Sequence, residues 1–64
     1  MTFAEKLKFA RQKLYLSQEG LAKVLNVSFA TVNRWETGKH EPGLAAQKAF
    51  YLYCKENNLD LEDK

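Results

Sequence analysis

The 64-residue sequence predicts an all-α fold, a compact bundle of four to five short helices forming one domain. It contains one proline and three glycines, so few positions interrupt a helix. The strict alternation of apolar and polar residues that is typical of strands is absent. Apolar residues instead recur at spacings of three and four, and most of these runs follow a residue that caps helices.

The first helix is predicted to begin after Thr2 and to end near Tyr15. Thr2 and Glu5 have the spacing of a capping box, in which each side chain accepts a hydrogen bond from the backbone N–H of the other residue. The apolar residues of this segment fall on one face, and they are Phe3, Leu7, Ala10 and Leu14.

A short second helix is expected after Ser17, which is a natural N-cap. Gly20 stands where the acid of a capping box would be expected. Asn26 tolerates the left-handed conformation that reverses the chain, and Val27 can pack inward. The inward-facing residues of this helix are predicted to be Leu21, Ala22 and Leu25.

Ser28 can cap a third helix, from about Phe29 to Thr37, which Gly38 ends. Val32 and Trp35 are three residues apart and are expected to face the core. Two short helices joined by a tight turn therefore form the middle of the chain.

Pro42 and Gly43 mark a loop, after which a fourth helix is predicted from Leu44 to about Asn57. The segment after it, 58–64, is acidic and is expected to fray or to form one loose turn. The inner side of the fourth helix is predicted to carry Ala45, Ala46, Ala49, Phe50 and Tyr53.

The charge of the chain is unevenly distributed. The formal net charge is +2, but residues 1–55 hold nine Lys and Arg against four Glu, which is consistent with a polyanionic partner. The apolar run Phe50–Cys54 is far too short to span a membrane, and residues 1–8 lack the apolar core of a secretory signal. A cytoplasmic protein without a membrane partner is expected.

Neither a disulfide nor a zinc site can be built within this chain from one cysteine, Cys54, and one histidine, His40. Cys54 is interpreted as a small buried or half-buried apolar residue, and His40 as a loop residue rather than a ligand or base. The sequence therefore predicts no catalytic residue, no metal and no cofactor.

The stretch from Leu16 to Lys39 contains Ser-Gln, Leu-Ala, Val-Ser and Trp-Glu-x-Gly-Lys at defined spacings. In these motifs it resembles the Xre/Cro type of helix-turn-helix, the family of the lambdoid phage repressors, from about Leu7 to Leu59. The resemblance implies a lambda repressor-like fold whose third helix enters the major groove of DNA. The implied function is sequence-specific binding of double-stranded DNA by a bacterial or phage transcriptional regulator, with a repressor as the expected role.

The chain departs from the family pattern at three places. Asn26 replaces the usual glycine of the turn, Gly20 replaces an acid of the second helix, and the fifth helix is truncated or absent. A single module makes few contacts, so a homodimer is expected at least on DNA, on a pseudo-palindromic operator.

Four residues of the third helix are the candidate base contacts, because Val32 and Trp35 turn them outward. Arg34 can bond guanine O6 and N7, Asn33 can reach base edges or phosphate, and Phe29 and Ala30 can contact thymine methyl groups. The alternatives are a solvated surface charge for Arg34 and a core aromatic for Phe29.

Phosphate contacts are expected around that helix, from helix ends and flanking residues. Ser17 and Ser28 can serve as structural caps instead, or in addition. The resemblance also implies a partly buried ion pair between Arg11 and Glu36, which would set helix orientation more than stability. The candidate phosphate contacts are Ser17, Gln18, Ser28, Thr31, Thr37, Lys39 and His40.

DNA binding is not the only function that such a chain could have. So short a helical chain has little room for an enzyme pocket. A helix-turn-helix used for protein interaction, such as an antitoxin-like partner, is the alternative, and a phage Cro-like or restriction-controller repressor would share the same chemistry. Apolar residues off the helix stripes would suit a protein partner or a dimer, or would be scattered without meaning, and they are Phe9, Tyr15, Tyr51 and Leu52.

Overall fold

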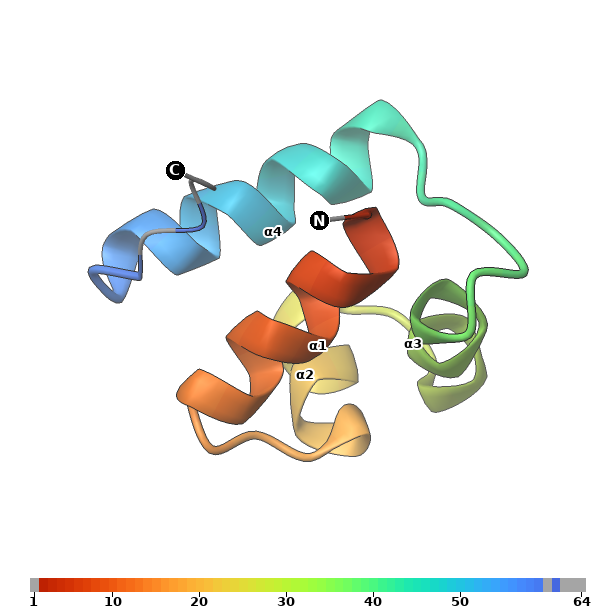
Figure 1. The fold of residues 1–64 in the computed structure, drawn as a ribbon, viewed down its shortest axis with the longest axis horizontal. Coiled ribbons are helices and arrows are strands. Elements are labelled where there is room, and N and C mark those ends of the chain that lie inside the picture. The colour runs from red at the N-terminus through yellow and green to blue at the C-terminus, as the bar shows by residue number, and fades with distance from the viewer. Residues whose placement is uncertain (1, 60, 62–64) are drawn as a thin grey trace.

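The computed structural model describes residues 2–59 and 61, and within them it contains four helices and no strand. The helices are α1 (Phe3–Lys13), α2 (Gln18–Leu25), α3 (Phe29–Glu36) and α4 (Leu44–Glu56), as Figure 1 shows. The predicted all-α class is confirmed, and each helix ends within about two residues of its predicted limit.

Side chains cap the amino ends of the first three helices. Thr2 and Glu5 form the predicted capping box, with a Thr2 N to Glu5 Oε1 distance of 2.9 Å and a Glu5 N to Thr2 Oγ1 distance of 3.2 Å. Ser17 Oγ accepts from Gly20 N at 2.9 Å, and Ser28 Oγ accepts from Thr31 N at 3.2 Å. These caps satisfy N–H groups that the helices leave free.

The carboxyl ends of all four helices share one hydrogen-bond pattern. After each helix one residue is left-handed, its N–H bonds the carbonyl three positions back, and the next N–H bonds the carbonyl five positions back. This is the Schellman motif. The left-handed residues are Tyr15, Asn26, Gly38 and Asn58.

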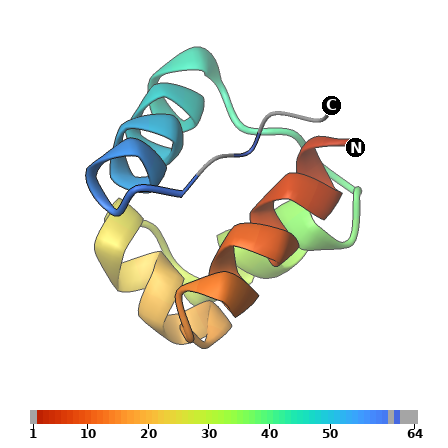
Figure 2. The same cartoon turned by 60° about the vertical axis from the view of Figure 1, so that its left-hand side comes forward.

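The core receives two residues from each helix, and α3 packs against α1 and α2 while α4 packs against α2. Phe50 is the largest of the fully buried side chains, and its ring lies edge-on to that of Phe3, with centroids 5.5 Å apart. The bundle measures 28 × 21 × 21 Å (Figure 2). The buried apolar residues are Leu7, Ala10, Leu21, Ala22, Val32, Trp35, Phe50 and Cys54.

The inner side of α4 differs in part from the prediction. Phe50 and Cys54 are buried and Ala46 is partly buried against the core, but Ala45 and Ala49 are exposed and Tyr53 is only half-buried. The stripe that packs is 46–50–54. Alanine fits either face of a helix, so its pattern did not fix the rotation of α4. The prediction that Cys54 is buried is confirmed.

The segment after α4 is held against the bundle where the structure describes it. Leu59 and Leu61 are partly buried against the core, and Figure 2 shows the chain turning back between α4 and α1. The apolar side chains of these two leucines lie on core surface, within the segment for which fraying or one loose turn is the prediction. Asp60 and residues 62–64 lie outside the described residues.

The apolar residues off the helix stripes differ in how exposed they are and in how they pack. Tyr51 is 38% exposed, but its ring lies 6.3 Å from that of Phe3 and 5.3 Å from that of Phe50, and Lys6 Nζ lies 5.9 Å from its centroid. Phe9 is half-buried. Tyr15, at 96% exposed, stands free of such packing. Contacts within the chain thus cover much of the aromatic surface near α4.

Candidate functional site

The outer face of α3 is built by the burial of its inner face. Val32 is 0% exposed and Trp35 is 7% exposed, and together they anchor the helix to the core. Asn33 and Arg34, which lie between them, consequently face solvent. The four candidate base-contact residues are all exposed on this one helix, and they are Phe29, Ala30, Asn33 and Arg34. Phe29, at 53% exposed, is not a core aromatic.

The two serines at the amino ends of α2 and α3 act as caps, and each cap retains a donor. Ser17 Oγ is an acceptor in its cap, so its own O–H hydrogen remains available to a phosphate. Ser28 Oγ also lies 2.8 Å from Thr31 Oγ1. One hydroxyl of this pair donates to the other, so one O–H remains for an outside acceptor.

Arg11 and Glu36 form an ion pair that joins α1 to the end of α3. Arg11 Nε lies 2.7 Å from Glu36 Oε2, and Arg11 Nη2 lies 3.0 Å from Glu36 Oε1. The third guanidinium nitrogen, Nη1, donates to the carbonyl of Leu16 at 3.2 Å. The Glu36 side chain is 2% exposed, so this bidentate pair holds a nearly buried carboxylate.

Hydrogen bonds extend this ion pair to the helix surface. Gln18 Nε2 donates to Glu36 Oε1 at 3.0 Å, and Asn33 Nδ2 donates to Gln18 Oε1 at 3.3 Å. Among the described residues, no buried side-chain nitrogen or oxygen lacks a hydrogen-bond partner. The sequence placed Gln18 and Asn33 in the candidate site separately and did not predict that they touch.

The loop after α3 carries Lys39 and His40. Arg34 and His40, with Thr31 and Trp35, line a surface cavity of about 180 Å³. Lys39 is exposed in the same loop, and Thr37 Oγ1 donates to the carbonyl of Arg34 at 3.1 Å. The candidate phosphate contacts on this side thus adjoin the candidate base contacts.

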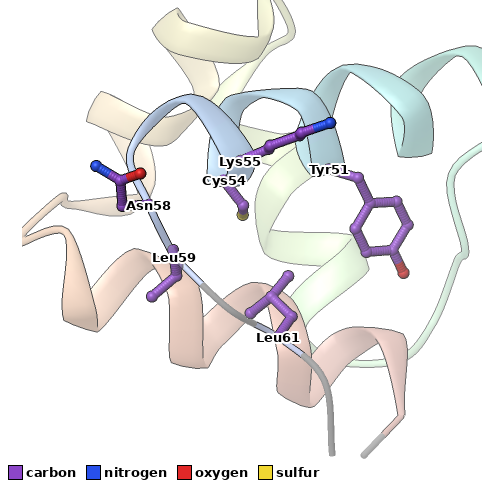
Figure 3. A pocket seen from close by; sticks show the side chains of 6 residues that line it. All are labelled: Tyr51, Cys54, Lys55, Asn58, Leu59 and Leu61. Atoms are coloured by element: carbon purple, nitrogen blue, oxygen red, sulfur yellow. The ribbon is translucent and has the colours of Figure 1, made fainter.

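A larger and more open groove of about 390 Å³ lies elsewhere, along the last turns of α4 and the segment after it (Figure 3). None of its lining residues belongs to α2 or α3. Cys54 lines it, and burial raises the pKa of the Cys54 thiol, which favours the neutral and unreactive form. The groove is lined by Tyr51, Cys54, Lys55, Asn58, Leu59 and Leu61.

Two further features of the described part of the chain bear on other kinds of site. None of its helices combines the length and apolar character needed to cross a membrane. Residues 2–59 and 61 contain no cluster of three or more His, Cys, Asp or Glu side chains that could hold a metal ion.

Comparison with known proteins identifies relatives of this chain. A family model described as helix-turn-helix matches residues 7–46, which include α2, the turn and α3. The HTH-type transcriptional regulator DicA of Escherichia coli (strain K12) is 38% identical over 42 residues. That match covers 66% of this chain and 31% of DicA, so this chain corresponds to less than a third of that regulator. No solved structure shows significant similarity.

Proposed function

The chain belongs to the Xre-type helix-turn-helix family, and on that premise we propose that it binds double-stranded DNA sequence-specifically as a transcriptional regulator. The observation that carries the proposal is the exposed outer face of α3, on a helix whose other face is fixed in the core by Val32 and Trp35. An α-helix fits the major groove, where base edges differ in their donors and acceptors.

In this proposal the outer residues of α3 read the bases. Arg34 bonds guanine O6 and N7, Asn33 bonds a base edge, and Phe29 and Ala30 contact thymine methyl groups. The exposure of Phe29 supports its role, because a half-exposed ring on this face can lose water against a methyl group.

Phosphates are held from both sides of α3. The amino ends of α2 and α3 offer free O–H and N–H groups, and the cavity that Arg34 and His40 line offers the N–H donors of the Arg34 guanidinium. Seven residues serve this role in the proposal, namely Ser17, Gln18, Ser28, Thr31, Thr37, Lys39 and His40.

The biological role proposed is that of a repressor acting at the nucleoid in the cytoplasm, without catalysis of its own. Two copies bind a pseudo-palindromic operator as a homodimer, since one module of 64 residues makes too few contacts for tight specific binding.

Selection of bound duplexes from a random pool, followed by binding isotherms at several salt concentrations, tests the proposal. We expect one enriched sequence with two half-sites, and an affinity that falls steeply with salt because bound phosphates release counterions. Binding that shows neither a preferred sequence nor salt dependence would refute it.

Lys39→Ala examines the phosphate side separately. Lys39 is exposed beside α3, so its removal is expected to weaken binding to every sequence alike and to lower the magnitude of the log–log salt slope by about one. Lys48→Ala is the matched control, because Lys48 is an exposed lysine on α4. A slope unchanged by Lys39→Ala would remove this residue from the interface.

A protein-interaction role is the second candidate. Exposed aromatic residues off the helix stripes would favour this role. The Tyr51 ring, however, packs within the chain, against the rings of Phe3 and Phe50 and beside the Lys6 ammonium group. Exposed Tyr15 remains available to a partner protein. Tyr15→Ala leaving DNA binding intact is the result expected if DNA is the ligand.

A further inference from the structure

We infer that Gln18 is a positioning residue that presets the amide of Asn33 to read adenine in the major groove. This inference rests on the proposed DNA-binding function and names the base that one residue reads. It follows from a chain of hydrogen bonds that begins at the buried Glu36 carboxylate and ends at the exposed surface of α3.

The first step concerns the orientation of Gln18. An ionised carboxylate only accepts hydrogen bonds, and Arg11 holds Glu36 in place through two of its nitrogens. The Gln18 amide therefore presents Nε2 to Glu36 Oε1, at 3.0 Å. A flipped amide would set two acceptor oxygens against each other. Gln18 Oε1 must consequently point away from Glu36.

The second step transmits this orientation to α3. Gln18 Oε1 is an acceptor and lies 3.3 Å from Asn33 Nδ2. Because Gln18 cannot flip without losing its bond to Glu36, Asn33 has to offer its nitrogen at this position. The buried ion pair thus fixes the direction of an amide that is itself exposed.

The third step is the pattern that Asn33 presents outward. An amide nitrogen carries two hydrogens, and one of them is used on Gln18. Asn33 keeps one N–H donor and its carbonyl acceptor. This pair complements adenine, which offers N7 as an acceptor and its N6 amino group as a donor. Guanine offers two acceptors, N7 and O6, and leaves the Asn33 carbonyl without a donor.

The test uses the duplex that wild-type protein selects from a random pool. In it, one adenine of each half-site is expected to depend on Asn33, and its replacement by 7-deazaadenine, which lacks N7, should weaken binding about tenfold. Asn33→Ala should abolish the sensitivity to that replacement. Asn33 is an exposed helical residue, so its change to alanine is expected to preserve the fold.

Gln18→Met tests the positioning role, because methionine keeps the length of the side chain and cannot form either bond. We expect the preference for adenine over guanine at that base pair to fall about tenfold, a larger loss than any decrease in affinity for random DNA, for which Gln18 is also a proposed phosphate contact. Adding Gln18→Met to Asn33→Ala should change the base preference no further. Gln12→Met is the control, since Gln12 is an exposed glutamine of α1.

Other outcomes overturn the inference. Equal loss of affinity for all sequences in Gln18→Met would make Gln18 a phosphate contact alone. If Asn33 conferred a preference for guanine, the inference would be refuted. It would also be refuted if the preference for adenine persisted in Gln18→Met. In both cases the proposed function would stand. Absence of duplex binding by the wild-type protein would refute both.

Discussion

Glu36 connects the inside of the protein to its candidate DNA-binding face. Its side chain is 2% exposed and takes hydrogen bonds from Arg11 and Gln18. Removing a carboxylate from water is costly, and the attraction of a paired guanidinium offsets much of that cost without a large surplus. The pair therefore fixes how α3 sits on α1 more than it adds to the free energy of unfolding.

Removing one partner of the ion pair should lower the free energy of unfolding far more than replacing both partners with apolar residues. Arg11→Met leaves Glu36 nearly buried without its cation and is expected to lower the free energy of unfolding by about 3 kcal/mol. Adding Glu36→Leu removes the unpaired charge and should recover most of that loss. Urea denaturation followed by circular dichroism measures both.

The control for this pair of variants is Lys13→Met, which removes an exposed cation of the same helix. Its effect should stay within about 0.5 kcal/mol. An Arg11→Met variant as stable as Lys13→Met would show that the ion pair contributes nothing measurable.

Arg34 is the residue expected to read guanine. It is exposed next to buried Trp35, and a guanidinium can bond guanine O6 and N7 together. Arg34→Ala should leave the fold intact, weaken binding to the selected operator by about 1 to 3 kcal/mol and relax one base pair of each half-site. Arg34→Lys should restore attraction to DNA but not the full preference.

Competition binding against operator variants with single base changes gives the measurement. Arg34 also borders the cavity that His40 lines, where a phosphate is proposed. If Arg34→Ala weakened specific and random DNA equally, Arg34 would be a phosphate anchor, and Asn33 and Phe29 would remain as the base readers.

All four helices described end in the same Schellman motif. The residue that follows the left-handed position is apolar and partly buried in three of the four motifs, at Leu16, Val27 and Leu59. Each motif therefore satisfies carbonyl groups, and these three also return the chain to the core. Asn58 explains in this way why the chain after α4 packs back instead of leaving the bundle.

Tyr15 is the exception among the left-handed residues. A side chain with a Cβ atom is disfavoured at its φ of 58°, and Asn or Gly bears this conformation more easily. The residue is 96% exposed, so little packing is lost with its side chain. Tyr15→Gly is expected to raise the free energy of unfolding by about 0.5 to 1 kcal/mol, measured by urea denaturation.

Gly38→Ala is the matched opposite change. Gly38 has a φ of 80°, and an added Cβ would meet nothing within 4 Å, so only backbone strain should act. A loss of about 1 kcal/mol is expected. If Tyr15→Gly destabilised the protein, the tyrosine ring would have a stabilising role that its exposure does not reveal.

At the scale of the whole molecule, the radius of gyration of 10.6 Å sets the reach of one copy. A single α3 touches only a few base pairs, so two copies on one face of DNA should bind with half-site centres about 34 to 36 Å apart. Footprinting on the selected operator is expected to show two protected half-sites that fill together as the protein concentration rises.

Half-turn insertions between the half-sites provide the control. Five added base pairs would rotate one half-site to the opposite face and should abolish joint filling, whereas ten should partly restore it. Protection of one half-site alone, in proportion to protein concentration, would contradict the dimer.

Much of this fold could be predicted from the sequence because its determinants are local. The Thr2 and Glu5 capping box, the Ser17 and Ser28 caps and the left-handed turn at Asn26 each involve residues a few positions apart. The two faces of α3 follow in the same way from the helical period and from Val32 and Trp35. A pattern of alanines could not set the rotation of α4, since either face of the helix accepts them.

The family resemblance implied the Arg11–Glu36 ion pair, but only the tertiary structure decided how the other polar groups of different helices meet. The Arg11–Glu36, Gln18–Glu36 and Asn33–Gln18 hydrogen bonds join residues that are 25, 18 and 15 positions apart. No local period relates such residues, and their contact depends on how α1, α2 and α3 pack around the core. The sequence determined which residues α3 turns outward, and the packing determined which hydrogen-bonding groups Asn33 presents there, because a buried acceptor at Glu36 orients the amides between them.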